Sequence, residues 1–598
     1  MAIEVKKRSE IDPRFQWRLD HIFATPEDWE AAYAAAPALI ESVAAWDGHV
    51  AEDPEKAVRT YFDAVEALIP IRMYAFLSKE GDNSDPRAQA MSEKVQGLST
   101  RFATAAAYLE PELLELDEAR LKAMAADPAM KDYDTFLQGL LREKAHTLPK
   151  EQERLISMMG EVAGAPSNIF DMLSSVDMKL PDVVLADGTK AKLTEGNYLS
   201  YIYSPERDLR RQAFEGLMST YGSFGNTIAT IYGASVKNDV FQARAHGYSS
   251  SRAMAMEPLQ IPQEVYDNMI QAAHEALPIL QEYCEVRREL LGLDELHMYD
   301  LYTPMVTDVD LDLPYDKAFD LVLEGLAPMG EDYIAKLREA RDGGWIDVYP
   351  AENKSSGAFS AGMLASVHPY VLLNHVDDLN STLTIAHELG HSMHSYYSNQ
   401  AQPVSKRNYS MFVAEVASIC NECVMTRYLQ RKLEGKREKA WLLNSFLEDF
   451  RTTCLRQTMF AEFEKTAHEM AERGEPLTRE SLSKVYLELN RLYYGKACVV
   501  DPLVANEWMR IPHFYTAFYV YVYATGLCAA VTLSERILEE GESAVRDYRR
   551  FLSAGSSFPP LEALKLAGID MSKPEPLRKA MQVYRDTLEQ FKAAVREG

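Results

Sequence analysis

The stretch that decides the interpretation of this chain reads His387-Glu388-Leu389-Gly390-His391. Apolar residues flank it at helical spacing, which predicts that it lies on a helix. Residues four apart share one face of a helix, so His387 and His391 can bind one metal ion from the same side. Glu388 lies about 100° around the helix and can act as general base toward a water molecule at the metal. This pattern is typical of a zinc hydrolase, but it lacks a third protein ligand.

The residues around the motif support the helix assignment. Asn380 or Ser381 is expected to cap the start of the helix. Gly390 costs about 1 kcal/mol relative to alanine inside a helix, so its presence needs a reason. We expect another part of the chain to approach the helix closely at this position.

Two residues further along the same helix are candidates for the third ligand, and both are unsuitable. His394 lies seven residues after His387, which is about 10 Å along the axis, whereas zinc–nitrogen distances are about 2 Å. Tyr397 stands where enzymes with the motif H-E-x-x-H-x-x-G-x-x-H have a third histidine, and His394 stands at their glycine position. The sequence therefore excludes that class.

A carboxylate from a following helix is the preferred third ligand. Residues 411–423 are mostly apolar or small, so an unpaired acid there would be costly to bury. Glu415, Ser418 and Glu422 form one polar stripe at i, i+3 and i+7. A zinc ion would account for Glu415, and Glu422 could orient a ligand histidine through its other ring nitrogen. The alternative is a solvated stripe on an amphipathic helix.

Composition and charge limit the class of protein. The 598 residues, 47% hydrophobic and 26% charged, are typical of a soluble globular protein with more than one core. The net charge of −27 argues against nucleic acid or an anionic membrane as a partner. Residues 1–10 lack a signal-peptide core, and the six cysteines form no disulfide framework, so we expect a cytoplasmic protein. Residues 511–534 contain no charge, but we expect a buried helix rather than a membrane span.

Helical spacing dominates the chain, which predicts a mainly α protein. Strand patterns are few: a hairpin over 183–194 around Asp187-Gly188, and a β-rich patch over 345–374 directly before the motif. We expect an N-terminal helical region over 1–195 and a catalytic region over 196–598.

Residues 387–394 (HELGHSMH), followed by 412–418 (FVAEVAS), resemble the oligoendopeptidase F family of the thimet oligopeptidase-like (M3) zinc metallopeptidases. The resemblance spans nearly the whole chain. Further blocks that carry it are 17–20 (WRLD), 356–360 (SGAFS), 369–374 (PYVLLN), 512–515 (PHFY), 518–521 (FYVY), 523–526 (YATG) and 551–556 (FLSAGS).

The resemblance implies a two-lobed helical shell around a deep cleft, with a small β-sheet next to the helix of the motif. It implies one zinc ion per chain, a cytoplasmic location, and cleavage of internal bonds in short unstructured peptides. His387, His391 and Glu415 match the zinc ligands of the family, and Glu388 matches its general base. His513 and the tyrosines after it match the groups that face the scissile carbonyl.

The choice among these tyrosines is open from the sequence. On a continuous helix, Tyr515, Tyr519 and Tyr523 share one face and Tyr521 does not. We favour Tyr519 and Tyr523 as partners of His513. The alternative is that all four tyrosines pack in the core.

Substrate alignment is expected from the strand over 370–374, whose backbone can pair with an extended peptide. The candidate substrate-binding residues are Gly357, Tyr370, Leu372 and Asn374. Two other functions stay open: a C-terminal exopeptidase of the dipeptidyl carboxypeptidase type, and a peptide-binding protein without turnover. The sequence leaves the oligomeric state undetermined.

Overall fold

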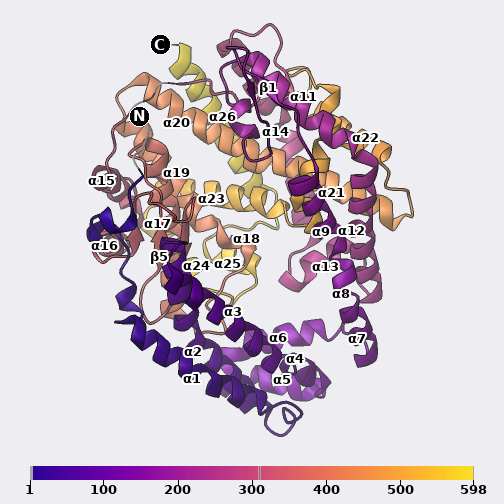
Figure 1. Cartoon of the computed structure of the whole chain (residues 1–598), viewed down its shortest axis with the longest axis vertical. Coiled ribbons are helices and arrows are strands. Elements are labelled where there is room, and N and C mark those ends of the chain that lie inside the picture. The colour runs from indigo at the N-terminus through magenta and orange to yellow at the C-terminus, as the bar shows by residue number, and fades with distance from the viewer. Residues whose placement is uncertain (1–4, 308, 310, 597–598) are drawn as a thin grey trace. The chain divides into compact units, whose positions relative to one another are not determined.

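The protein was analysed as a computed structural model that describes residues 5–307, 309 and 311–596. It is mainly helical, as predicted (Figure 1). The chain forms two compact units, each built from three separate segments. Unit 1 comprises Met1–Ala145, Asp310–Leu429 and Ala529–Asp570, and unit 2 comprises His146–Val309, Gln430–Cys528 and Met571–Gly598. The border predicted at residue 195 lies inside unit 2, and the catalytic region over 196–598 stays a prediction.

Unit 1 contains the long N-terminal helices and the helices around the motif. Proline at the first helical position and a side-chain cap start the first three: Thr25, Asp53 and Asp85 each accept a hydrogen bond from a backbone N–H of the first turn. The helices are α1 (Pro26–Ala44), α2 (Pro54–Gly81), α3 (Pro86–Ala106), α4 (Leu109–Glu115), α5 (Glu118–Ala126), α6 (Asp134–Glu143), α15 (Tyr315–Gly325), α16 (Glu331–Asp342), α17 (Leu379–Ala401), α18 (Met411–Ala414), most of α19 (Val416–Lys432), α24 (Glu542–Leu552) and α25 (Pro560–Leu566).

Unit 2 is a second helical assembly, and α23 (Tyr521–Glu540) runs from it into unit 1. A π-helix, η9 (Phe450–Leu455), joins two of its long helices. Its helices are α7 (Lys150–Met158), α8 (Gly160–Ala163), α9 (Ala165–Met172), α10 (Tyr198–Ile202), α11 (Arg207–Ser223), α12 (Gly225–Ala245), α13 (Ser251–Met256), α14 (Gln263–Leu290), α20 (Lys436–Asp449), α21 (Arg456–Glu472), α22 (Arg479–Tyr494) and α26 (Glu575–Arg596).

Both predicted β regions are present. In unit 2, β1 (Val183–Val184) and β2 (Lys190–Ala191) pair antiparallel across a turn in which Gly188 has φ 83°. In unit 1, β3 (Ile346–Asp347), β4 (Phe359–Ala361) and β5 (Tyr370–Leu372) form a sheet in the order β3-β5-β4. β5 is parallel to β3 and antiparallel to β4, so it is the middle strand.

The helix of the motif, α17, begins slightly earlier than predicted. Its N-cap is Asp378, whose carboxylate accepts a hydrogen bond from the N–H of Ser381 at 2.7 Å. The prediction that Asn380 or Ser381 caps the helix is wrong, because Asp378 is extended and its carboxylate reaches the first turn. The predicted close approach at Gly390 is confirmed: a Cβ there would lie 2.6 Å from the carbonyl oxygen of Ala417.

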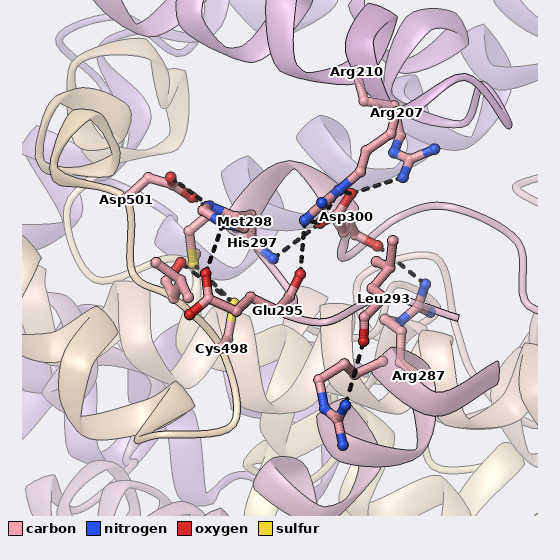
Figure 2. Close-up of polar contacts among 12 residues, drawn as sticks. Arg207, Arg210, Arg287, Leu293, Glu295, His297, Met298, Asp300, Cys498 and Asp501 are labelled. Carbon is pink, nitrogen blue, oxygen red and sulfur yellow. Dashed lines mark hydrogen bonds and ion pairs between the residues drawn. The ribbon is translucent and has the colours of Figure 1, made fainter. Parts of the chain in front are cut away.

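In unit 2, ion pairs and hydrogen bonds hold the loop after α14 in place (Figure 2). Asp300 is fully buried and accepts a hydrogen bond from Arg207 at 2.9 Å and from Arg210 at 2.7 Å. Asp501 accepts a hydrogen bond from the N–H of Met298 at 3.0 Å, and one of its oxygens lies 2.8 Å from Nδ1 of His297. The Asp300 contacts tie the loop after α14 to α11, and the Asp501 contacts tie the same loop to the start of η10 (Pro502–Arg510).

The uncharged stretch over 511–534 was expected to be a buried helix, and much of it is. Residues 524–534 of α23 are all buried. Among the residues that the structure describes, no helix combines the length and apolar character needed to cross a membrane.

Candidate functional site

Three potential metal ligands converge in unit 1: His387 and His391 on α17, and Glu415 between α18 and α19. The two Nε2 atoms lie 3.2 Å apart. Oε2 of Glu415 lies 3.5 Å from Nε2 of His387 and 3.4 Å from Nε2 of His391. Tetrahedral zinc with ligands at 2.0–2.1 Å separates them by about 3.3 Å. The donor atoms and their spacing therefore fit one zinc-sized cation.

Glu415 occupies a break between two helices rather than the middle of one. α18 ends at Ala414, and α19 begins at Val416. Ser418, which is fully buried, donates its hydroxyl to the backbone oxygen of Glu415 at 2.9 Å and to Oε2 at 3.0 Å. Burial raises the pKa of Glu415, but the hydrogen bond and charge of His391 outweigh it and hold the pKa at about 2. The carboxylate is therefore ionised and held toward the histidines.

Glu422 lies on α19, seven residues after Glu415, and contacts the opposite side of His387. Its Oε1 lies 3.0 Å from Nδ1 of His387. Burial lowers the pKa of His387, but the hydrogen bond and charge of Glu422 outweigh it and raise the pKa to about 9. With the Nδ1 hydrogen held by Glu422, a metal can take the place of the proton at Nε2, which is the arrangement that orients histidine ligands.

Glu388 is buried beside the three ligands, with 5% of its surface exposed. Its Oε2 has no hydrogen-bond partner among the described residues. Burial raises the pKa of this carboxyl group, an effect opposed by the charges of His387 and His391. An acid with these properties suits proton transfer rather than a structural ion pair.

His394 and Tyr397 lie outside the group of three ligands found among the described residues. The ring of His394 stacks on Tyr409 with centroids 3.6 Å apart, and burial lowers the pKa of His394 to about 3. Tyr397 stacks on Tyr333. Both side chains therefore pack within unit 1.

Sequence reasoning missed one residue that holds the two ligand helices together. Asn421 is fully buried and donates its side-chain amide to the backbone oxygen of Ala386 at 2.9 Å. Its Oδ1 accepts a hydrogen bond from Tyr333 at 3.1 Å. The sequence does contain a sign of this role, since Asn421 is a lone amide in a largely apolar helix. A buried amide needs hydrogen-bond partners, so a contact with a neighbouring segment could have been predicted.

His513 and the two favoured tyrosines form a second cluster, in unit 2. The hydroxyl of Tyr523 lies 3.4 Å from Nε2 of His513. The ring of Tyr519 lies 6.5 Å from that of His513 and 5.4 Å from that of Tyr523, centroid to centroid. Burial lowers the pKa of His513, so its imidazole is neutral near pH 7.

Of the other two tyrosines, Tyr521 is buried in the core and Tyr515 is partly buried. The ring of Tyr515 stacks on Phe170, and its hydroxyl is buried without a partner among the described residues. Tyr521 is 2% exposed. The prediction of one continuous helix through these tyrosines is wrong. η11 (Pro512–Tyr515) ends at Tyr515, and α23 begins only at Tyr521.

The expected pairing of the strand over 370–374 with a substrate backbone is wrong, because β5 is hydrogen-bonded on both sides. Val371 donates its N–H to Trp345 O at 2.9 Å, and β4 pairs along the other edge. Tyr370 and Leu372 are fully buried. Asn374 donates its side-chain amide to the backbone oxygen of Gly357 at 2.8 Å, so this pair stabilises a loop.

These features define a class: a helical protein with a His-His-Glu donor set and an adjacent buried glutamate, as in metal-dependent hydrolases. Comparison with known proteins makes the class specific. The family model described as Peptidase family M3 matches residues 200–583, and the model described as Oligopeptidase F matches residues 112–179. The chain belongs to peptidase family M3, a family of metalloendopeptidases.

Relatives are similar over almost the full length. Oligopeptidase PepF of Bacillus subtilis is 40% identical, with 99% of this chain and 88% of the relative covered. Group B oligopeptidase PepB of Streptococcus agalactiae is 35% identical, with 99% of each covered. Oligoendopeptidase-F from Enterococcus faecium has a similar structure, with a TM-score of 0.73, 31% identity, and coverage of 96% of this chain and 99% of that one.

Proposed function

We propose that this protein is a zinc-dependent endopeptidase that cleaves internal bonds of short unstructured peptides in the cytoplasm. The observation that carries the proposal is the convergence of two Nε2 atoms and one carboxylate oxygen, all within 4.8 Å, beside the buried Glu388. The names of the similar proteins support oligopeptides as substrates. All six cysteines are free thiols, which suits a reducing compartment.

His387, His391 and Glu415 would hold one zinc ion per chain. Two imidazoles and one carboxylate are the donor set of many catalytic zinc sites, in which a fourth position stays open. Glu422 would keep His387 in the orientation and tautomer that the metal requires. The chemistry that bound zinc supplies is polarisation of the scissile carbonyl and a lower pKa for a neighbouring water molecule.

Glu388 acts as general base and then as general acid. Its carboxylate takes a proton from the attacking water molecule and passes it to the amine that leaves. The partner-free Oε2 is available for this proton. Burial keeps the pKa of Glu388 above the ordinary value, which makes its carboxylate a stronger base toward the attacking water molecule than an exposed glutamate.

His513, Tyr519 and Tyr523 supply hydrogen bonds to the oxygen that becomes negatively charged. A neutral imidazole and a phenol both donate hydrogen bonds without carrying a charge of their own. The 3.4 Å contact between Tyr523 and His513 keeps the two donors together. Such donors act mainly in the transition state, so their loss lowers kcat more than it raises KM.

Substrate alignment is assigned to β4 instead of β5. β4 pairs with β5 on one side and has no strand partner on its other side among the described residues. Ser360 of β4 contacts Ser392 of α17, with the hydroxyl oxygens 2.8 Å apart, so this edge lies against the helix of the motif. Pairing through the main chain accepts many sequences, which suits a broad oligopeptidase.

The test combines two variants with one peptide digest. Glu388→Gln is expected to bind zinc stoichiometrically, since Glu388 is not a ligand, and to lose about 10²- to 10⁴-fold in kcat. Glu415→Ala is expected to lose tight zinc binding. Turnover near the wild-type value in Glu388→Gln would refute the general-base role.

A mixed-peptide digest followed by mass spectrometry, with and without a chelator, tests metal dependence and the position of cleavage. Each peptide is supplied with a free and with an amidated C-terminus. An endopeptidase cuts both forms at the same internal bonds. Loss of cleavage on amidation would instead identify a C-terminal exopeptidase.

A further inference from the structure

The turn that leads into Tyr519 and Tyr523 has an unusual backbone. Phe518 has φ 54°, in the left-handed region that bulky residues rarely adopt. It lies between η11, which carries His513, and α23, which carries Tyr523. A backbone outlier beside proposed catalytic groups needs a contact that maintains it.

That contact is a buried carboxyl group. Glu464 on α21 is fully buried, and its Oε1 accepts a hydrogen bond from the N–H of Phe518 at 2.7 Å. The ring of Phe518 packs against His468, one turn further along α21, with centroids 4.6 Å apart. Both the backbone and the side chain of Phe518 are therefore held by the same helix.

Neighbouring N–H groups of this turn are satisfied locally. Thr516 donates to the backbone oxygen of His513 at 3.0 Å, and Val522 donates to that of Tyr519 at 3.2 Å. The buried N–H of Phe518 donates instead to a side chain from another helix. Without an acceptor it would be a buried unpaired donor, which proteins avoid. Loss of the carboxyl group is thus expected to change the turn.

We propose that Glu464 is a positioning residue, which holds Phe518 in the left-handed conformation and thereby orients Tyr519 and Tyr523 beside His513. This inference rests on the proposed function, because it assigns a purpose to the geometry of the proposed oxyanion donors. Glu464 itself contacts backbone and core side chains. It acts on the reaction through the turn.

The charge state of Glu464 gives the proposal a distinctive signature. Burial raises the pKa of its carboxyl group to about 8, an effect that His468 and the N–H of Phe518 reduce and Asp239 increases. The phenols of Tyr232 and Tyr266 also face this carboxyl group. Its Oε2 has no hydrogen-bond partner among the described residues. Ionisation above about pH 8 therefore places a poorly compensated charge under the turn.

The experiment uses three variants of the full-length, zinc-loaded enzyme. Glu464→Gln keeps an oxygen acceptor and removes the titration, whereas Glu464→Leu removes both. Thr466→Val is the matched control on the same helix, because its hydroxyl donates only within α21, to the backbone oxygen of Glu462. The measurements are kcat and KM from pH 6 to 9.5, zinc content, and a crystal structure of Glu464→Leu.

The expected result separates positioning from simple destabilisation. Glu464→Leu should keep its zinc and lose about 10- to 100-fold in kcat with KM changed less than about threefold, because small misplacements of catalytic groups cost this much. The kcat of the wild type should decline near pH 8, and Glu464→Gln should match the wild type below pH 7 and lack this decline. Thr466→Val should follow the wild type throughout.

Two results would overturn the proposal. One is a Glu464→Leu enzyme whose kcat stays within twofold of Thr466→Val. The other is a crystal structure of Glu464→Leu in which φ of residue 518 and the contact between His513 and Tyr523 are unchanged. A wild-type enzyme that holds zinc but cleaves no peptide would refute the proposed function, and the crystal structure would then decide the positioning role alone.

Discussion

Replacing Gly390 by alanine tests whether the close packing of α17 against the start of α19 sets the ligand geometry. A Cβ at position 390 would lie 2.6 Å from the oxygen of Ala417 and from Cα of Ser418, and 2.8 Å from the nitrogen of Ser418. All three are backbone atoms and cannot rotate away. The two segments must separate by about 1 Å to reach ordinary van der Waals contact.

This displacement is large compared with the tolerance of a metal site. Glu415 lies two residues before Ala417, so its Oε2 moves with the backbone that alanine displaces. Ligand distances in metal sites vary by about 0.2 Å, so we expect zinc affinity to fall at least about tenfold. Overpacking costs about 1–3 kcal/mol of folding stability, against about 1 kcal/mol gained from the higher helix propensity of alanine.

Zinc affinity is measured by competition with a chelating dye, and stability by urea unfolding of the metal-free protein. Gly97→Ala is the matched control, because Gly97 lies in α3 and a Cβ there meets nothing within 4 Å. The control should gain up to about 1 kcal/mol and keep its zinc affinity. If Gly390→Ala binds zinc as tightly as the wild type and is equally stable, the close approach does not set the ligand geometry.

Three further changes give defined outcomes. Oε1 of Glu422 lies 3.0 Å from Nδ1 of His387, so Glu422→Ala should weaken zinc binding about 10- to 100-fold in the same dye assay. Glu422→Gln should lose less zinc affinity than Glu422→Ala. The pKa of Glu464 is about 8 in the folded state against 4.5 for an exposed glutamate, so the folded state binds more protons between these pH values. The free energy of unfolding should therefore fall by up to about 5 kcal/mol as the pH rises from 4.5 to 8. Urea unfolding at pH 5 and pH 9 should show a smaller change in this free energy for Glu464→Gln than for the wild type. His368 should make stability depend on pH in the opposite direction. Burial lowers its pKa from 6.5 to about 4, so stability falls as the pH drops through this range. If Tm falls between pH 6.5 and 4 as steeply in His368→Gln as in the wild type, His368 is not the cause.

Residues 387–391 show how much helix geometry and the preferences of single residues can predict. The spacing of His387 and His391 defines their shared face, because helix geometry is the same wherever a helix forms. The need to pair a buried acid indicated Glu415, and the cost of glycine in a helix indicated a close contact at Gly390. The close contact at Gly390 is present, and Glu415 lies in one group with His387 and His391, whereas its role as a ligand stays a prediction.

The predictions from sequence were wrong where the structure of a segment depends on the other segments that it packs against. The strand over 370–374 has the composition of any buried strand, and its place in the middle of the sheet depends on pairing with β3 and β4. The run from Pro512 to Tyr523 has helical spacing, yet its backbone is interrupted between Tyr515 and Tyr521. Tertiary contacts, including the hydrogen bond from Phe518 to Glu464, stabilise that interruption against the local preference.

The sequence by itself determined which side chains can bind a metal and that two of them project from one helix. The tertiary structure decided that Glu415 reaches the same point, that Glu422 lies behind His387, and that His513 meets Tyr523. The physical reason is the distance along the sequence over which each kind of interaction acts. Periodicity constrains residues within a few turns of each other, whereas a ligand from a second helix is placed by backbone packing, here the contact of Gly390 with Ala417 and Ser418.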